Sequence, residues 1–283
     1  MDAVLVYVFD PKFLFEVAVG LLIGTLAGVT GMPLGALRLP AIYSVVPTPQ
    51  IAAGTNLGID TLTATIASYR YWKARLVETT IFVFMGGFSC IGSFLGGYSA
   101  KYISYKWLLV FIGLVYLCVG LDMLCRTSGG GSGTGQLSEG ESDDEGSGEG
   151  SGRESRMQGM KGKGAVIAAL WGFVLGFIGG MAGLLMGSLR VPTMIKVMGL
   201  APAAAAGTNM AISSVTALSG FIGHLLHKNL DLSVLLTMGI ASMIGSYAGS
   251  HLGVTLSPLT ARRLIGAAII LMAITLFIKG IRL

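Results

Sequence analysis

Charged side chains are scarce in this chain of 283 residues, and that scarcity limits the class of protein. Asp, Glu, Lys and Arg together make up 12% of the sequence, against roughly 25% in a typical soluble protein. Apolar residues make up 53% and gather in runs long enough to cross a bilayer. The composition therefore argues against a soluble enzyme and predicts a polytopic membrane protein.

Cysteines and cofactor motifs are also sparse. The three cysteines, Cys90, Cys118 and Cys125, show no C-x-x-C spacing, so neither a disulfide framework nor a metal site is expected. The chain contains no G-x-x-x-x-G-K-[ST] sequence and no nucleic-acid-binding motif. We therefore expect no cofactor and no nucleic-acid partner. The N-terminus lacks the basic region and cleavage site of a secretory signal, so we expect it to insert uncleaved.

Eight apolar segments are predicted as spans, at about 20 residues per crossing. They lie near residues 13–31, 50–71, 79–100, 107–124, 165–183, 203–226, 232–254 and 261–278. Two further segments, 31–49 and 183–202, are too broken by Gly and Pro to be ordinary spans and too apolar to be water-exposed loops. We interpret each as a re-entrant or broken half-helix that lines a cavity. The predicted fold is an all-α membrane protein with two duplicated four-helix halves.

A polar stretch separates the halves. Residues 127–163 are rich in Gly, Ser and acids, so we predict a disordered linker, with a regulatory or partner-binding role as the alternative. Residues 1–126 then form the first transmembrane repeat and residues 164–283 the second. Basic residues follow the linker's acidic part, so the positive-inside rule predicts that the linker and both termini are cytoplasmic. The protein is expected to be a multi-pass protein of the cytoplasmic membrane.

The two halves repeat one sequence pattern. Residues 24–40, GTLAGVTGMPLGALRLP, match residues 176–192, GFIGGMAGLLMGSLRVP, and residues 49–56, PQIAAGTN, match residues 202–209, PAAAAGTN. Glycines at every third or fourth place, such as Gly24 and Gly28, predict close backbone contact between helices. Duplicated halves are typical of transporters, whose substrate sites lie between the repeats near the bilayer midplane.

An arginine occurs at the same place in each repeat, Arg38 and Arg190. An intramembrane Arg costs about 2.5–3.5 kcal/mol on insertion scales, so each is a functional candidate. Acidic partners are scarce in the spans, and a guanidinium fork without one suits oxyanions such as sulfite, sulfonate or carboxylate. We predict an anionic substrate, with snorkelling of the arginines to lipid headgroups as the alternative.

An A-G-T-N motif opens the second span of each half just after a proline. Free backbone N–H groups and polar side chains at such a helix N-terminus form a donor cluster that attracts anions. The predicted substrate-binding residues here are Thr55, Asn56, Thr208, Asn209, Gly54 and Gly207, and we add Gly35 and Gly187 from the preceding motif. Helix capping alone is the alternative for the Thr and Asn side chains.

Asp60 lies one helical turn after Asn56, whereas the equivalent residue of the second half is Ser213. Asp60 is a candidate to carry a coupling proton, and the alternative is an ion pair with one of the arginines. His224 and His251 are titratable near neutral pH and could relay protons; the alternative is that each is a buried or interfacial histidine without that role.

With these motifs written out, the chain resembles the sulfite exporter TauE/SafE family, whose halves each carry a G-x-G-G-G-x-x-x-P-x-L type motif followed by A-x-G-T-S/N. Here the first motif reads GMPLGALRLP from Gly31 and GLLMGSLRVP from Gly183, with two central glycines replaced in each half. The second reads AGTN in both halves. The resemblance covers nearly the whole chain apart from the linker. It implies export or uptake of small sulfur-containing or organic anions, driven by an ion gradient.

The sequence therefore predicts a secondary transporter of small anions with its site at the repeat interface. Its expected partners are an anionic substrate, the lipid bilayer and a coupling ion. A passive anion channel and a membrane scaffold that recruits a partner through the acidic linker are alternatives. An intramembrane enzyme with a Ser–His pair is disfavoured because neither G-x-S-x-G nor H-E-x-x-H occurs. Whether the halves are parallel or inverted depends on whether residues 31–49 cross the membrane.

Overall fold

The computed structural model describes residues 10–30, 32–46, 48–102, 165–196 and 198–252, with isolated positions between 104 and 121 and at 274. Most of these residues are helical, and no strand occurs among them, which confirms the all-α fold class. The predicted linker and the predicted spans at 107–124 and 261–278 lie outside the continuously described ranges. The count of eight spans and the domain boundaries therefore stay predictions.

The helices follow the same order in both halves. The first half contains α2 (Pro11–Thr30), α3 (Gly35–Val45), α4 (Pro49–Lys73), α5 (Thr79–Ile81), the π-helical turn η1 (Phe82–Gly86), α6 (Gly87–Ser99) and η2 (Ala100–Tyr102). The second contains α9 (Ala165–Ala182), α10 (Gly187–Lys196), α11 (Pro202–Leu225) and α12 (Leu232–Leu252). Among the described helices, three are long and apolar enough to cross a membrane: Pro11–Gly28, Thr79–Tyr102 and Leu232–Gly249.

The short helices α3 and α10 occupy the two broken segments. The 11 residues of α3 extend about 16 Å at 1.5 Å per residue, roughly half of the 30 Å hydrocarbon core. The 10 residues of α10 make a helix of similar length. Pro49 and Pro202 then start α4 and α11 at the first helical turn, where proline is favoured. The predicted half-helices are thus present in both halves.

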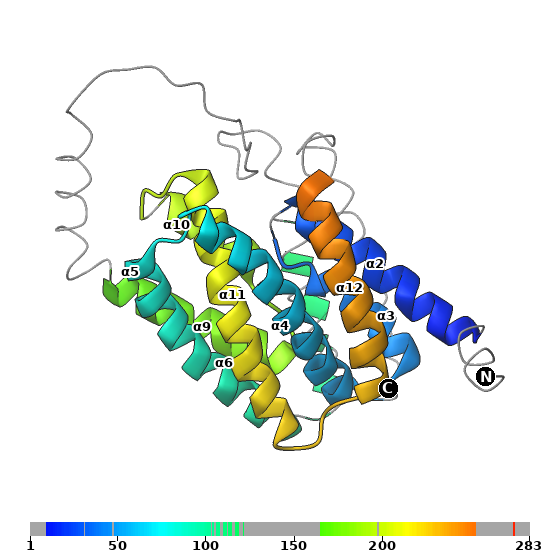
Figure 1. The fold of residues 1–283 in the computed structure, drawn as a ribbon. Coiled ribbons are helices and arrows are strands. Elements are labelled where there is room, and N and C mark those ends of the chain that lie inside the picture. The colour runs from blue at the N-terminus through cyan, green and yellow to red at the C-terminus, as the bar shows by residue number, and fades with distance from the viewer. Residues whose placement is uncertain are drawn as a thin grey trace, which may run out of the picture.

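Helices α4 and α11 lie side by side in the centre and run in opposite directions (Figure 1). Thr55, near the start of α4, contacts Asp231 beyond the end of α11. Thr208, near the start of α11, contacts Glu78 beyond the end of α4. Equivalent helices of the two repeats are therefore antiparallel, and the two halves are inverted relative to each other.

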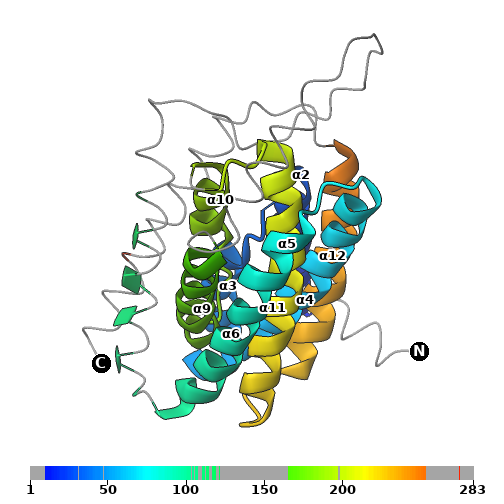
Figure 2. The same cartoon turned by 90° about the vertical axis from the view of Figure 1, so that its left-hand side faces the viewer.

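The first helix of each half packs against the last long helix described in the other half. Figures 1 and 2 show α2 beside α12 on one flank and α9 beside α6 on the opposite flank. Gly20 and Gly24 lie against the backbone of Met238 and Ser242, so a side chain at either glycine would collide with it. Residues 20 and 24 of α2 meet residues 238 and 242 of α12, so residue numbers increase in the same direction along both helices. Helices α2 and α12 are therefore parallel. The predicted close helix packing through Gly24 is confirmed.

The segment between α2 and α4 crosses rather than turns back. Helix α12 is parallel to α4 as well as to α2, because Gly58 lies against Leu235 and Gly239 against Leu62. Consecutive helices α2 and α4 therefore point the same way, and α3 must carry the chain back between them. This favours the broken half-helix over the re-entrant alternative, because α3 and the residues beside it lead the chain from the end of α2 to the start of α4.

The direction of α9 determines the face of the protein on which the second half begins. Helix α9 is parallel to α6, since Gly172 and Gly176 meet Met85 and Ser89 in the same order. Helix α6 in turn is parallel to α11, as the Ser219–Cys90 bond and the contact of Gly223 with residue 94 show. Helices α2 and α9 are consequently antiparallel, so residues 10 and 165 lie on opposite faces. The predicted placement of the N-terminus and the linker on one face does not fit this arrangement.

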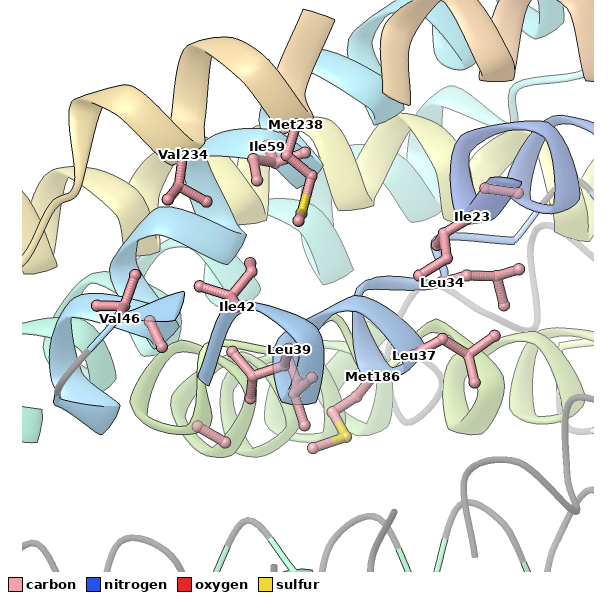
Figure 3. Packing of buried hydrophobic residues seen from close by; sticks show 14 of the residues in the cluster. Ile23, Leu34, Leu37, Leu39, Ile42, Val46, Ile59, Met186, Val234 and Met238 are labelled. Atoms are coloured by element: carbon pink, nitrogen blue, oxygen red, sulfur yellow. The ribbon is translucent and has the colours of Figure 1, made fainter. Parts of the chain in front are cut away.

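The main hydrophobic cluster encloses α3. Leu39 and Ile42 of α3 have no exposed surface, and they belong to a cluster with Met186 and Met238 of the second half (Figure 3). Large apolar side chains on the outer helices, such as Leu22 at 64% exposure, face outward, as lipid contact requires. Helix α3 is therefore largely enclosed by the protein, and its Arg38 side chain is buried with it.

Candidate functional site

Both intramembrane arginines are buried inside the protein. Arg38 is 1% exposed and Arg190 is 0% exposed, and they are the two largest fully buried side chains among the described residues. Such burial argues against snorkelling to lipid headgroups. A buried guanidinium must find acceptors, because desolvating an ion without a partner costs several kcal/mol.

Arg38 has acceptors for all three of its nitrogens. Its Nε donates to Asn56 Oδ1 at 2.9 Å, its Nη1 to Ser242 Oγ at 3.4 Å and its Nη2 to the Asn56 carbonyl oxygen at 3.4 Å. Nη2 also forms an ion pair with Oδ1 of Asp60, which is 2% exposed. Asp60 thus has one of the two roles that the sequence left open for it, the ion pair with an arginine.

Asn56 ties this cluster to the second half. Its Nδ2 donates to the carbonyl oxygen of Gly183 at 2.7 Å and to that of Gly35 at 3.3 Å. Gly183 has φ of 71°, and a Cβ there would collide with Ala53. Only glycine suits both the left-handed backbone and the close approach to α4. The pattern that the two repeats share therefore includes a glycine needed at the interface between them.

The equivalent cluster of the second half lacks partners. None of the three guanidinium nitrogens of Arg190 has a hydrogen-bond partner in the part of the chain that the structure describes. Both amide atoms of Asn209 and the hydroxyl of Ser213 are likewise without one there. All three side chains are 0% exposed. Leaving a buried polar group unpaired costs about 1–3 kcal/mol, so this concentration requires an explanation.

Sequence differences between the halves account for the contrast. The second half has Ser213 where the first has Asp60, so the carboxylate that neutralises Arg38 has no counterpart beside Arg190. Ser89 is the counterpart of Ser242, and it accepts a hydrogen bond from the hydroxyl of Thr216 at 3.1 Å. Helix η1, one turn before Ser89, is a π-helical turn, whereas α12 is α-helical throughout.

Glycines at the starts of α3 and α10 admit the site residues of the neighbouring helix. A Cβ at Gly187 would lie 2.6 Å from Asn209 Nδ2, and a Cβ at Gly35 would lie 2.9 Å from Asn56 Nδ2 and would also collide with Asp60. The predicted site residues are therefore brought together in pairs, Gly35 with Asn56 and Gly187 with Asn209, and Asn56 also contacts Arg38. In each half the N-terminus of a short helix faces this cluster.

The predicted threonines contact the opposite half instead of the arginines. Thr55 Oγ1 accepts the backbone N–H of Asp231, and Thr208 Oγ1 accepts that of Glu78, both at 2.9 Å. Side chains at the neighbouring residues Gly54 and Gly207 would collide with the carbonyl oxygens of Asn229 and Leu76. These four residues of the AGTN motifs make matched contacts between the halves, and their predicted role in substrate binding stays a prediction.

His224 is buried at 0% exposure, and its Nε2 donates to the carbonyl oxygen of Gly180 at 2.9 Å. This bond supports its interpretation as a buried histidine, while the side chain of His251 lies outside the described residues. Among the described residues no group of three His, Cys, Asp or Glu side chains could hold a metal ion.

Sequence reasoning missed Ser89 and Ser242. Ser242 both accepts from Arg38 and donates to the Gly20 carbonyl oxygen at 3.0 Å. The signal that could have found them is the repeat itself, because the pair aligns one turn before the matched Gly92-Ser93 and Gly245-Ser246 dipeptides.

Comparison with known proteins agrees with this repeat architecture. The sequence profile of the sulfite exporter TauE/SafE family matches residues 16–276. The chain belongs to the sulfite exporter TauE/SafE family. It is 24% identical, over 95% of its length and 99% of the relative's, to the "Probable membrane transporter protein YunE" of Bacillus subtilis (strain 168). No solved structure matches the chain.

Proposed function

We propose that this TauE/SafE family protein is a secondary transporter of small oxyanions and that Arg190 binds the substrate. Family membership and the name of the Bacillus subtilis relative indicate a membrane transporter. The observation that carries the proposal is the fully buried Arg190 without a hydrogen-bond partner among the described residues. A bound anion would supply both the missing acceptors and the missing negative charge.

The chemistry around Arg190 suits an oxyanion. A guanidinium offers parallel N–H groups that match two oxygens of a carboxylate, sulfite or sulfonate. Asn209 and Ser213 add uncharged donors without partners in the described chain. The N-terminus of α10 begins beside Asn209, and its free N–H groups and dipole favour negative charge. These three features of α10 and α11 thus favour an anion between the two helices.

The inverted halves support alternating access. Inverted repeats can exchange conformations across the bilayer and so expose a central site to one side and then the other. With the linker placed in the cytoplasm by its basic end, residue 10 lies at the outer face of the cytoplasmic membrane. Because the sequence contains no nucleotide-binding motif, we assign the driving force to a coupling ion.

Flux into proteoliposomes tests this proposal. Purified protein is reconstituted, and uptake of sulfite, thiosulfate, methanesulfonate and acetate is measured for wild type, Arg190→Met and the control Lys73→Gln. Lys73 is exposed at the end of α4, so its replacement removes the same charge far from the site. Arg190→Met removes the charged contact with the substrate, which should cost more than about 2 kcal/mol of binding free energy. This corresponds to an affinity loss of roughly 30-fold or more.

Two results would contradict the proposal. Saturable flux of one anion with the same apparent affinity in Arg190→Met would remove Arg190 from the site. Flux that is not accelerated by substrate on the opposite side of the membrane would favour a passive channel over a carrier.

A further inference from the structure

We infer that the first half contains a second anion site which the protein itself closes with Asp60. This inference rests on the proposed function of Arg190, because Asp60 would occupy in one half the place that the substrate takes in the other. In this view the transporter has one working site, and its duplicated counterpart is held permanently in a ligand-bound form.

The equivalence of the two clusters carries the inference. Arg38 and Arg190 align in the repeat, as do Asn56 and Asn209, and all four side chains are buried. The position one turn after each asparagine holds Asp60 in one half and Ser213 in the other, and both are buried. Replacing a carboxylate by a hydroxyl group removes the negative charge and one of two acceptor oxygens, and a negative charge is what Arg190 lacks among the described residues.

The bonding of the carboxylate describes the substrate that would replace it. Oδ1 of Asp60 pairs with Arg38, while Oδ2 has no partner in the described chain and lies where a Cβ of Gly35 would be. One oxygen thus faces the guanidinium and the other faces the start of α3. The corresponding ligand at Arg190 would place one oxygen on the guanidinium and another beside Gly187 at the start of α10.

Charge balance narrows the substrate class further. The single carboxylate charge of Asp60 is matched by the single charge of Arg38, and no other ionic partner of either is present in the described part of the chain. By equivalence, Arg190 balances one negative charge, and a second would stay buried without a partner at a high cost. The site should therefore prefer monovalent oxyanions such as hydrogensulfite, sulfonates or carboxylates over divalent sulfate.

Exchanging the two residues between the halves tests the inference. Binding of radiolabelled methanesulfonate to the purified full chain is measured by equilibrium dialysis, with sulfate as the divalent competitor. We expect one methanesulfonate per wild-type protein, two for Asp60→Ser and none for Ser213→Asp. The double variant Asp60→Ser, Ser213→Asp should again bind one methanesulfonate. Adding Arg38→Met to this double variant should abolish that binding. Sulfate should compete at least tenfold less well than methanesulfonate.

The outcomes separate this inference from the proposed function. One bound anion in wild type and still one in Asp60→Ser would overturn the closed second site and leave the Arg190 site standing. No binding to wild type but one anion in Asp60→Ser would support the second site and overturn the Arg190 site. No binding to either would overturn both.

A second variant covers the case in which Asp60→Ser does not fold. Asp60→Asn keeps the shape of the side chain but removes its charge, so Arg38 is left without its ion pair. We expect its thermal unfolding temperature to fall and to recover in methanesulfonate by several degrees more than wild type gains. Equal gains for the two proteins would overturn the inference.

Discussion

Arg38 and Arg190 occupy equivalent positions in two halves of one duplicated unit, yet their surroundings differ. Arg38 has an acceptor for each of its nitrogens, including an internal carboxylate, whereas Arg190 has none among the described residues. Both copies of the unit thus contain a buried arginine, but among the described residues only Arg38 has an internal counterion, Asp60. The first cluster is stabilised by its own side chains, and in the second the proposed anion would supply the missing partners.

The contacts between the halves are, by contrast, matched. The hydrogen bonds of Thr55 and Thr208 have the same length, and the glycines of α2 and α9 meet equivalent residues of α12 and α6. Symmetric contacts therefore join the halves, while the asymmetry is concentrated at the arginines. Substitutions at the arginines, glycines and threonines should therefore affect stability differently, most strongly at Arg38.

Replacing Arg38 should be the most damaging change. Arg38→Met leaves the Asp60 carboxylate buried without its ion-pair partner, and breaking a buried pair in this way costs about 3–5 kcal/mol. Thermal unfolding of the purified protein in detergent measures the loss. The double variant with Asp60→Asn should recover most of it, since no buried charge then remains. A double variant as unstable as Arg38→Met would show that the ion pair is not the cause.

The glycine contacts should be equally sensitive in both halves. Gly24→Ala and Gly176→Ala each place a methyl group against the backbone of the partner helix, at Ser242 and Ser89, and such overpacking costs about 1–3 kcal/mol. Gly87→Ala is the control, because nothing lies within 4 Å of a Cβ there. Unfolding temperatures of the three variants provide the comparison. A clear difference between the first two would break the proposed symmetry of the helix packing.

The threonine bonds should make smaller, equal contributions. Thr55→Val and Thr208→Val each remove the acceptor of one backbone N–H from the opposite half, at a cost of about 1 kcal/mol. The two bonds lie at opposite ends of the α4–α11 pair, so their costs should add in the double variant. Chemical or thermal unfolding of the two single variants and the double variant tests this. Strong non-additivity would indicate that the two ends are coupled.

Arg190→Met should have the smallest effect on stability. It removes a buried charge that has no partner in the described chain, so stability should be unchanged or improved in the absence of substrate. The same unfolding assay that detects the loss in Arg38→Met provides the measurement. A comparable loss in Arg190→Met would mean that Arg190 already has an internal counterion, and the contrast between the halves would fail.

Local sequence was sufficient for much of the fold and for part of the candidate site. Apolar runs identified a membrane protein, and the Gly and Pro pattern of residues 31–49 indicated a re-entrant or broken half-helix, because these features depend on neighbouring residues. The repeat alone marked Arg38, Arg190, Asn56 and Asn209, since equivalent positions can be aligned without knowing what they contact. It also showed that Asp60 has no acidic counterpart.

Only the tertiary structure decided what those residues contact. The inversion of the halves rests on contacts such as that of Thr55 with Asp231, 176 residues apart, and composition says nothing about the relative direction of two such helices. The same holds for the choice of Arg38 over Arg190 as the partner of Asp60, because both arginines are equally compatible with the sequence. Side chains distant in the chain must be brought together before a buried charge can be recognised as paired or unpaired, and packing alone does that.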